Sequence, residues 1–180
     1  MKFVEMDCPG VWLIEPEVFA DSRGAFRRHF CKEEFARHGL SATVAQGNIS
    51  ENHALGTLRG FHFQQGPHAE AKTISCMTGS IYDVVIDLRR SSPTFMQWRS
   101  VEISAIDRRS IYVPAGCANA WITTSVETTL HYYMSEMFAP TSASGIRYDD
   151  PAFNVRWPMV PKVISDRDRA FPDFDLTLIE

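Results

Sequence analysis

The stretch that decides the fold is Ile81-Tyr82-Asp83-Val84-Val85-Ile86-Asp87-Leu88. Its even-numbered positions are apolar, and aspartates lie between them at Asp83 and Asp87. Successive side chains of a β-strand point to opposite faces of a sheet, so this alternation predicts a half-buried strand. The turn Thr78-Gly79-Ser80 precedes it and a polar loop at residues 89–94 follows, so both ends of the strand are defined.

Segments of the same kind continue on both sides of this strand. Further strands are expected at residues 57–64, 73–78, 97–103, 111–114, 120–124 and 127–134. Short strands at regular spacing, with turn residues between them, are typical of an antiparallel sandwich or barrel. The chain is therefore expected to be mainly β, with few and short helices.

The two ends of the chain have a different character. Residues 11–19 form a strand pattern interrupted by Pro16, which predicts the edge of a sheet. Asp21-Ser22-Arg23-Gly24 signals a turn, and residues 31–40 are the best helix candidate, ending at Gly39. The tail after residue 140 lacks periodicity. We expect it to cover the barrel as loop and short helix, because four apolar side chains need burial: Trp157, Val160, Val163 and Ile164.

Length and composition are those of one ordinary globular domain. The 180 residues are 44% hydrophobic and 22% charged, enough to bury a core. We divide the domain into an N-terminal arm at about 1–30, a barrel at about 40–140 and a C-terminal segment at about 141–180. The formal net charge of −4 provides no general attraction to nucleic acids or membranes, so neither is an expected partner.

The sequence contains no recognisable targeting or membrane segment. Glu5 lies where a signal peptide would be apolar, and no run of about 18 apolar residues occurs. The four cysteines are scattered without a CxxC pair, which favours reduced thiols and a cytoplasmic location. These cysteines are Cys8, Cys31, Cys76 and Cys117.

The strand at residues 56–64 is unusually polar for a core strand. It places Arg59 and His62 three residues apart, and Lys72 follows shortly after it. This pattern indicates a strand that lines a pocket for an anionic substrate. Two interpretations of His62 remain open: a core histidine with satisfied hydrogen bonds, or a general base, which histidine serves well near neutral pH.

A histidine base needs a carboxylate to orient its ring, and the segment Asp166-Arg167-Asp168-Arg169 contains two candidates. In the strand at residues 127–134, Tyr132 and Tyr133 are adjacent, so one points inward and the other outward, and the pattern does not choose between them. The pairs Arg89-Arg90 and Arg108-Arg109 are expected to be solvated turn charges.

Several other kinds of site find little support in the sequence. Neither GxGxxG nor GxxxxGK[ST] occurs, so these phosphate-binding loops are absent. A metal-dependent barrel could use His62, His68 and Glu70. However, Gln64 and Asn119 stand where such barrels carry further histidines, and a neutral amide is a poor ligand for a transition metal.

A series of ordered motifs resembles the dTDP-4-dehydrorhamnose 3,5-epimerase family, the cupin-type nucleotide-sugar epimerases. The match covers almost the whole chain, in the family's order. Its motifs are Asp21-Ser22-Arg23-Gly24, Arg59-Gly60-Phe61-His62-Phe63-Gln64, Pro67-His68-Ala69 with Lys72, residues 85–95, Val113-Pro114-Ala115-Gly116, residues 145–152 and residues 164–168.

The resemblance implies a jelly-roll (cupin) barrel, a homodimer, no metal and no organic cofactor. It also implies a nucleoside-diphosphate 4-keto-6-deoxy sugar as substrate, with inversion at C3, C5 or both through an enolate. By the family's pattern His62 is the base, Asp168 orients it, Lys72 lies beside the enolate and Tyr132 returns a proton on the opposite face.

The same resemblance implies substrate-binding positions. These are Arg23, Phe26, Gln46, Asn48, Arg59, Asn119, Phe138 and Arg167, with Phe19 as a further aromatic beside the nucleotide. Strict alternation would place Arg59 on the face opposite His62, so a twist or bulge near Gly60 is expected if both contact one ligand.

Two positions depart from the family's pattern. Asn119 replaces the usual histidine of an Ala-His-Gly triplet, and Arg28 replaces a carboxylate near the nucleotide region. The first change suggests inversion at a single centre or a different sugar, and the second suggests a CDP- or GDP-linked substrate. A non-catalytic sugar-nucleotide-binding cupin is the remaining alternative.

Overall fold

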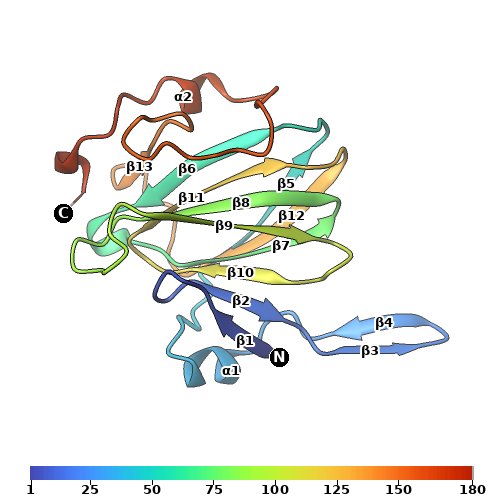
Figure 1. The fold of residues 1–180 in the computed structure, drawn as a ribbon. Helices are drawn as coiled ribbons and strands as arrows, with labels where there is room; N and C mark the ends of the chain where they lie inside the picture. Colours follow the sequence, from blue (N-terminus) through green and yellow to red (C-terminus); the bar gives the residue numbers. More distant parts are fainter. Residues whose placement is uncertain (180) are drawn as a thin grey trace.

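A computed structural model describes residues 1–179 as two antiparallel sheets packed face to face. The larger sheet has the strand order β1-β2-β10-β7-β12-β5, and the smaller has the order β13-β6-β11-β8-β9. Figure 1 shows the two sheets as the layers of one barrel, with α1 below it and α2 above it. The predicted antiparallel jelly-roll architecture is confirmed.

The larger sheet combines two strands from the start of the chain with four strands from the middle of the chain. Its members are β1 (Lys2–Glu5), β2 (Trp12–Glu15), β10 (Ser110–Val113), β7 (Lys72–Thr78), β12 (Thr128–Met134) and β5 (Gln46–Asn52). Because β2 pairs with both β1 and β10, it is an interior strand, so the predicted edge position was wrong. Pro16 lies just beyond β2, where no ladder hydrogen bond is lost.

The smaller sheet carries the polar strand and the stretch at residues 81–88. Its members are β13 (Ala143–Gly145), β6 (Leu58–Gln64), β11 (Cys117–Thr123), β8 (Ser80–Asp87) and β9 (Trp98–Ser104). The helical elements are short: α1 (Lys32–Arg37), η1 (Gly66–His68), α2 (Asp166–Arg169) and η2 (Leu176–Leu178).

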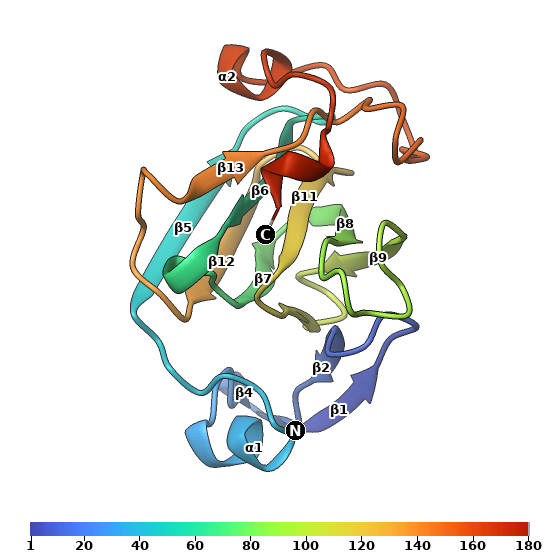
Figure 2. The same ribbon diagram turned by 90° about the vertical axis from the view of Figure 1, so that its left-hand side faces the viewer.

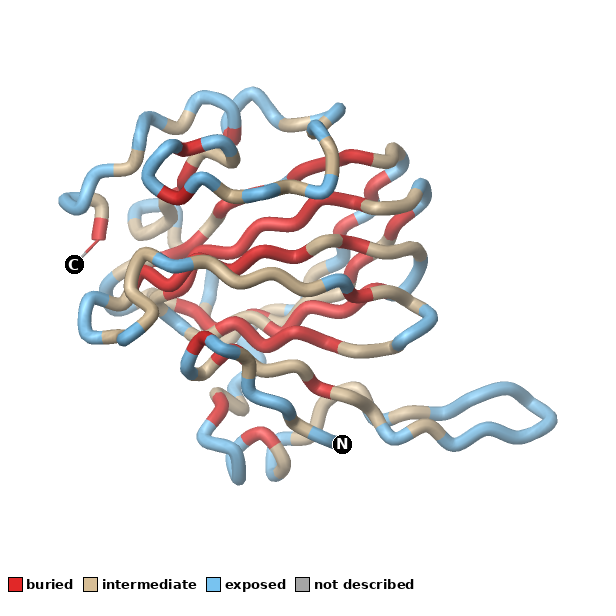
Figure 3. The backbone as a smooth tube through the Cα atoms, in the orientation of Figure 1, coloured by how far each residue is buried: buried red, intermediate tan, exposed pale blue. Residues whose placement is uncertain are grey.

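The strand β8 is buried on both faces, so the prediction of a half-buried strand was wrong. Val85 packs in the core between the sheets, whereas Val84 and Ile86 pack in a second core on the outer face. Residues of the C-terminal segment cover that outer face, among them Phe153 and Ile179. Figure 3 shows the strands of the barrel as the most buried part of the molecule, with the C-terminal segment lying over them.

The C-terminal segment crosses the barrel as loop and short helix, as predicted (Figures 1 and 2). Trp157 and Ile164 are partly buried, but Val160 and Val163 remain 83% and 47% exposed. Burial of the two valines was therefore a wrong prediction. Their segment contacts the barrel through backbone hydrogen bonds, including one from Leu58 N to Val163 O at 2.8 Å.

The predicted N-terminal arm is narrower than residues 1–30. β1 and β2 belong to the larger sheet, and the projecting element is the hairpin of β3 (Val18–Asp21) and β4 (Gly24–Arg27). Figures 1 and 3 show this hairpin extending away from the barrel with its residues mostly exposed. The predicted turn at residues 21–24 forms its tip.

The cysteines and the arginine pairs can be compared with their predicted states. All four cysteines are free, as predicted, and all but Cys31 are buried. Arg89 differs from its prediction, because its guanidinium lies 2.8 Å from the fully buried Asp87 carboxylate instead of being solvated. Within residues 1–179 no helix is long and apolar enough to cross a membrane.

Candidate active site

A bulge in β6 brings Arg59 and His62 to the same side of the strand. His62 pairs with Asn119 of β11 and Arg59 pairs with Trp121, so three steps along β6 oppose two along β11. Gly60 lies inside this bulge with a φ of +112°, and a Cβ atom there would lie 2.6 Å from Asn119 O. The predicted irregularity near Gly60 is confirmed, and only glycine fits it.

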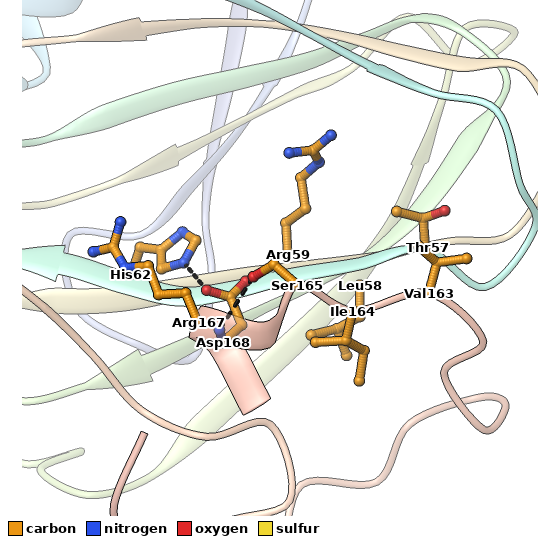
Figure 4. A pocket seen from close by; sticks show the side chains of 9 residues that line it. All are labelled: Thr57, Leu58, Arg59, His62, Val163, Ile164, Ser165, Arg167 and Asp168. Carbon is orange, nitrogen blue, oxygen red and sulfur yellow. Dashed lines mark hydrogen bonds and ion pairs between the residues drawn. The ribbon is translucent and has the colours of Figure 1, made fainter. Parts of the chain in front are cut away.

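The imidazole of His62 is held by a carboxylate from the other end of the chain. His62 Nε2 lies 2.7 Å from Asp168 Oδ1, and Asp168 Oδ2 accepts a hydrogen bond from Gly60 N at 3.1 Å. Ser165 caps the short helix α2 by accepting a hydrogen bond from Asp168 N, which positions this carboxylate. Figure 4 shows the pair, with His62 extending from β6 and Asp168 from α2.

The electrostatics of this pair define the tautomer of His62. Burial alone would raise the pKa of Asp168, but hydrogen bonds from His62 and the Gly60 amide outweigh it and lower that pKa. Asp168 is therefore ionised and accepts a proton-bearing Nε2, which leaves the lone pair of the imidazole on Nδ1. A histidine in this state can remove a proton through Nδ1.

Lys72 lies close to His62, and two contacts fix its ammonium group. Its Nζ lies 2.8 Å from Glu70 Oε1 and donates to His62 O at 3.0 Å. Glu70 is itself only 4% exposed and accepts a hydrogen bond from Gln64 N. A cation held in this way needs little reorganisation to stabilise negative charge that develops nearby.

The structure distinguishes the two adjacent tyrosines. Tyr132 lines the cavity with His62 and Lys72, whereas the Tyr133 ring lies on the other face of β12, 5.5 Å from the His29 ring. Burial raises the pKa of Tyr132, and the positive charge of Arg59 opposes that rise only in part. The Tyr132 hydroxyl therefore remains protonated at neutral pH and can donate its proton.

Two neighbouring cavities share His62 and Arg167 in their linings. One, of about 390 Å³, is lined by Thr57, Leu58, Arg59, His62, Val163, Ile164, Ser165, Arg167 and Asp168 (Figure 4). The other, of about 170 Å³, contains Lys72, Asn119, Trp121, Tyr132 and Phe138. The first is rich in positive charge and the second holds the groups that could transfer protons.

The two arginines of the larger cavity are oriented by uncharged partners. Arg59 Nε donates to Asn52 Oδ1 at 2.8 Å, so the side chain spans from the smaller sheet to the larger one. Arg167 lies over the Phe171 ring, 5.9 Å from its centroid. Neither guanidinium forms an ion pair with another of residues 1–179, so both are available to an anion.

Phe171 depends on a close approach to the backbone of β13. The ring lies against Gly145, where a Cβ atom would be only 2.1 Å from the ring. The same ring lies 6.4 Å from the imidazole of His62. Any side chain at Gly145 would displace Phe171 and with it the surroundings of His62 and Arg167.

The other binding positions expected from the resemblance fall into two groups. Asn119 and Phe138 line the smaller cavity. Gln46 and Asn48 lie on β5 beside β12, where Gln46 Oε1 accepts a hydrogen bond from Phe138 N at 2.7 Å and Asn48 pairs with Tyr132.

Arg23 and Phe26 are not brought to His62 within one chain. Both lie on the projecting β3–β4 hairpin, where the Arg23 side chain is 88% exposed and pairs with Asp21. Phe26 is 71% exposed and lies directly opposite Phe19, which is 57% exposed. Arg28, just beyond β4, contacts Glu34 of α1.

The residues considered for a metal site have other partners in the structure. Glu70 contacts Lys72, and His62 Nε2 contacts Asp168. Among residues 1–179 no three or more histidine, cysteine or acidic side chains form a group that could hold a metal ion.

Sequence reasoning missed the parts played by Glu70, Trp121 and Phe171. For Glu70 a signal was present, because it precedes Lys72 by two residues, a spacing that places side chains on one face of an extended chain. The contacts of Phe171 depend on a glycine 26 residues earlier in the chain, and no local pattern indicates them.

The barrel and its cavity define a cupin-type jelly-roll protein with a carboxylate-oriented histidine at its open end. A sequence profile of the family described as dTDP-4-dehydrorhamnose 3,5-epimerase matches residues 5–175. The chain belongs to the dTDP-4-dehydrorhamnose 3,5-epimerase family.

Relatives of known structure or activity show how far the similarity extends. The chain is 41% identical over 179 residues to the dTDP-4-dehydrorhamnose 3,5-epimerase of Mycobacterium tuberculosis, covering 97% of this chain and 88% of the relative. The Bacillus anthracis enzyme with TDP and pyrophosphate bound superposes with a TM-score of 0.92 at 36% identity, covering 96% and 99% of the two chains. A 3'-monoepimerase of Streptomyces bikiniensis in complex with dTDP-quinovose superposes with a TM-score of 0.86 at 33% identity, covering 93% and 85%.

Proposed function

We propose that this chain is a cofactor-independent epimerase of a nucleoside-diphosphate 4-keto-6-deoxy sugar. The observation that carries the proposal is the oriented His62–Asp168 pair in one cavity with Lys72 and a protonated Tyr132. The reaction inverts C3, C5 or both by removing a proton from one face of the ring and returning a proton to the other.

The substrate's ketone makes the first step possible. A carbonyl at C4 acidifies the C–H bonds at C3 and C5, because the electron pair released by either carbon can be delocalised onto the carbonyl oxygen. His62 Nδ1 takes the proton, Asp168 stabilises the resulting imidazolium, and the enolate oxygen lies beside the Lys72 ammonium. No electrons are gained or lost overall, so the chemistry needs no redox group.

Tyr132 completes the inversion from the other side of the ring. Its hydroxyl donates a proton to the enolate carbon, the C4 ketone re-forms, and the phenolate is reprotonated from solvent while His62 loses its proton. Its hydroxyl is protonated in the resting enzyme, as a general acid must be, because burial holds its pKa above the ordinary tyrosine value. Base and acid on opposite faces are what distinguish inversion from simple exchange.

The nucleotide end of the substrate fits the larger cavity. Arg59 and Arg167 are positioned to hold the diphosphate. Gln46 and Asn48 extend the site along β5, and Phe138 lies beside Gln46. A thymidine carrier is favoured by the relatives that bind TDP or dTDP sugars. CDP and GDP carriers remain the alternative suggested by Arg28, although its guanidinium contacts Glu34.

We further infer a homodimer in which the β3–β4 hairpin of one copy completes the site of the other. The hairpin holds two opposed phenylalanines in solvent, which is an unfavourable arrangement for an isolated chain. Association would bury Phe19 and Phe26 and deliver Arg23 to a second site, since Arg23 contacts no part of its own cavity.

Solvent exchange tests the proposed reaction. Incubation of dTDP-4-keto-6-deoxyglucose with the enzyme in heavy water should place deuterium at C3, C5 or both, observed by NMR. His62→Ala should abolish labelling, whereas Tyr132→Phe should still label the carbon but give less inverted product. Absence of label with the dTDP-, CDP- and GDP-linked sugars would refute the proposal and favour a non-catalytic binding protein.

His68→Ala is the matched control. It removes a second imidazole, at η1, from a residue that lines neither of the two cavities and does not contact the His62–Asp168 pair. It should leave exchange close to the wild-type rate. A metal-dependent reaction through His62, His68 and Glu70 predicts the opposite, namely loss of activity in both histidine variants.

Mixing two inactive variants tests the shared site. His62→Ala and Arg23→Ala each disable both sites of a homodimer, but a mixed dimer has one site with both residues intact. The two variants are mixed in equal amounts, mildly unfolded and refolded together. With random pairing about half of the dimers are mixed and each has one intact site, so activity should return to about one quarter of wild type. No recovery would place Arg23 and His62 in the same chain's site.

Inversion of a single centre is the second candidate. It is favoured by Asn119, which departs from the family's histidine, and by the similarity to a 3'-monoepimerase. The exchange experiment separates the two, because a single-centre enzyme labels only one of C3 and C5.

A further inference from the structure

Two polar atoms, in residues that line the smaller cavity, have no hydrogen-bond partner within residues 1–179. They are Asn119 Oδ1 and Trp121 Nε1, in residues that are only 2% and 7% exposed. The two residues are separated by one position on β11, so both side chains point into the space between the sheets. Buried polar atoms are nearly always paired, so this acceptor and this donor point to a missing ligand group.

The orientation of the Asn119 amide is defined by its neighbours. Nδ2 donates to Asp83 Oδ1 at 2.8 Å and lies 3.3 Å from Val84 O. A backbone carbonyl can only accept a hydrogen bond, so the atom facing Val84 must be the amide nitrogen. Oδ1 therefore points away from Asp83 and Val84, and the amide offers the cavity an acceptor with no proton to transfer.

We propose that Asn119 and Trp121 form a subsite that binds one hydroxyl group of the sugar ring. A sugar hydroxyl is both a donor and an acceptor, so one group can donate to Asn119 Oδ1 and accept from Trp121 Nε1. The inference rests on the proposed function, because the hydroxyl belongs to the 4-keto sugar in this cavity. It assigns Asn119 to substrate selection and not to proton transfer.

The position of the subsite restricts which hydroxyl it binds. Asn119 is the direct cross-strand partner of His62, and such partners have side chains about 5 Å apart. A hydroxyl held there is close to the carbon from which His62 removes a proton. When that carbon is C3, the hydroxyls at C3 and C2 of a 4-keto-6-deoxyhexose meet this condition, whereas C5 has only the C4 ketone, the ring oxygen and the C6 methyl beside it.

The chemistry of the two residues predicts strict selection against a deoxygenated sugar. Without the hydroxyl, both buried atoms would remain unpaired in the complex. Sites built to bind a hydroxyl discriminate strongly against analogues that lack it, by about 100-fold or more. The substrate class is therefore a 4-keto-6-deoxyhexose that retains the hydroxyl beside its reacting carbon.

The test compares three substrates on the wild-type enzyme and two variants. The substrates are dTDP-4-keto-6-deoxyglucose, its 2-deoxy analogue and its 3-deoxy analogue, with kcat/KM for deuterium exchange, at whichever of C3 and C5 the enzyme labels, as the measurement. The wild-type enzyme should use one of the two deoxy analogues about 100-fold less well than the parent sugar. Asn119→Leu and Trp121→Phe should each reduce that ratio about tenfold or more by slowing the parent sugar alone.

Met134→Leu is the control, because Met134 also lines this cavity but presents no hydrogen-bonding group. It should leave the ratio unchanged. Equal use of all three sugars by the wild-type enzyme, or equal losses on all three in the variants, would overturn the proposal.

Calorimetric binding of the same three sugar nucleotides separates this proposal from the proposed reaction. If no exchange occurs with any sugar, epimerisation is refuted, yet the subsite still predicts weaker binding of one deoxy analogue by about 100-fold. Equal dissociation constants for the three nucleotides would refute the subsite even in an active epimerase.

Discussion

Asp83 and Asp87 lie four residues apart on β8 and are both 0% exposed, yet their surroundings shift their pKa values in opposite directions. Burial raises the pKa of Asp83 to about 7, and Asn119 and Lys72 counteract it only in part. Burial acts in the same sense on Asp87, but hydrogen bonds from Arg89, Ser92 and Thr94 outweigh it and hold that pKa well below its usual range.

Neither side chain is exposed to solvent, but the two carboxyls differ in the number of hydrogen-bond donors around them. Asp87 accepts from Arg89 Nε and Nη2 at 2.8 Å each and from Thr94 Oγ1 at 2.6 Å. Asp83 accepts one hydrogen bond, from Asn119, and its Oδ2 has no partner within residues 1–179. The Asp87 end of β8 is a completed structural cluster, whereas the Asp83 end lies beneath the cavity and is left incomplete.

Asp87→Asn should lower the free energy of unfolding more than any other substitution in these two clusters. The substitution removes the charge that compensates Arg89, and it directs an amide NH2 at groups that are themselves donors. We expect the free energy of unfolding to fall by about 3–5 kcal/mol. Urea denaturation at pH 7 measures the change, and a loss no larger than that of an exposed pair would show that the cluster contributes little.

Asp83→Asn should stabilise the protein, but only at higher pH. The folded-state pKa of Asp83, about 7, exceeds its ordinary value of 3.8, so the stability linked to this group is complete below pH 3.8 and is lost as pH rises to 7. The variant carries no such group and should exceed the wild type by on the order of 2–3 kcal/mol at pH 8, with little advantage at pH 4.

Unfolding curves of both proteins across that pH range provide the measurement. Because all other titrating groups are common to both, the difference between the curves isolates Asp83. If the free energies of unfolding of the two proteins changed in parallel with pH, Asp83 would already be ionised in the folded protein.

Gly116→Ala should weaken the Asp87 cluster indirectly. Gly116 has a φ of +81°, and a Cβ atom there would lie 2.6 Å from Arg89 Cγ, so the arginine must shift relative to Asp87. We expect a loss of about 1–2 kcal/mol in the free energy of unfolding. Gly39→Ala is the control, since its φ of +71° is similar but no atom lies within 4 Å. Equal losses would assign the whole effect to backbone conformation.

Lys2→Ala should have the smallest effect. Lys2 pairs with Glu15 across β1 and β2 at 2.9 Å, but their side chains are 69% and 40% exposed. Solvent screening limits such a pair to less than about 0.5 kcal/mol. Thermal denaturation in low and high salt checks this limit, and a larger loss would require an explanation other than the ion pair.

Much of the fold could be predicted from strand spacing and turn residues, which are local properties. The aspartates of β8 misled that analysis, because polar residues at alternate positions resemble a solvent-facing strand. Both are buried because the loop at residues 89–94 and Asn119 provide partners for them. The exposed Val160 and Val163 are the opposite case, where apolar character did not lead to burial.

The site was predictable where its members are close in sequence or part of a recognised motif. The polar strand indicated Arg59 and His62, and the acidic cluster at residues 166–169 indicated a carboxylate. Which aspartate contacts His62 depends on how α2 lies over β6, and the unpaired Trp121 Nε1 depends on packing in the cavity. These are tertiary properties that no local pattern contains.

The pairing of His62 with Asp168 also has a consequence for how the enzyme is made. The two residues are 106 positions apart in the sequence, so His62 is synthesised long before Asp168. Strands of the barrel can begin to pair during synthesis, whereas the imidazole acquires its carboxylate only after residue 168 has left the ribosome. Truncated translation products that end before residue 168 should therefore lack the oriented base.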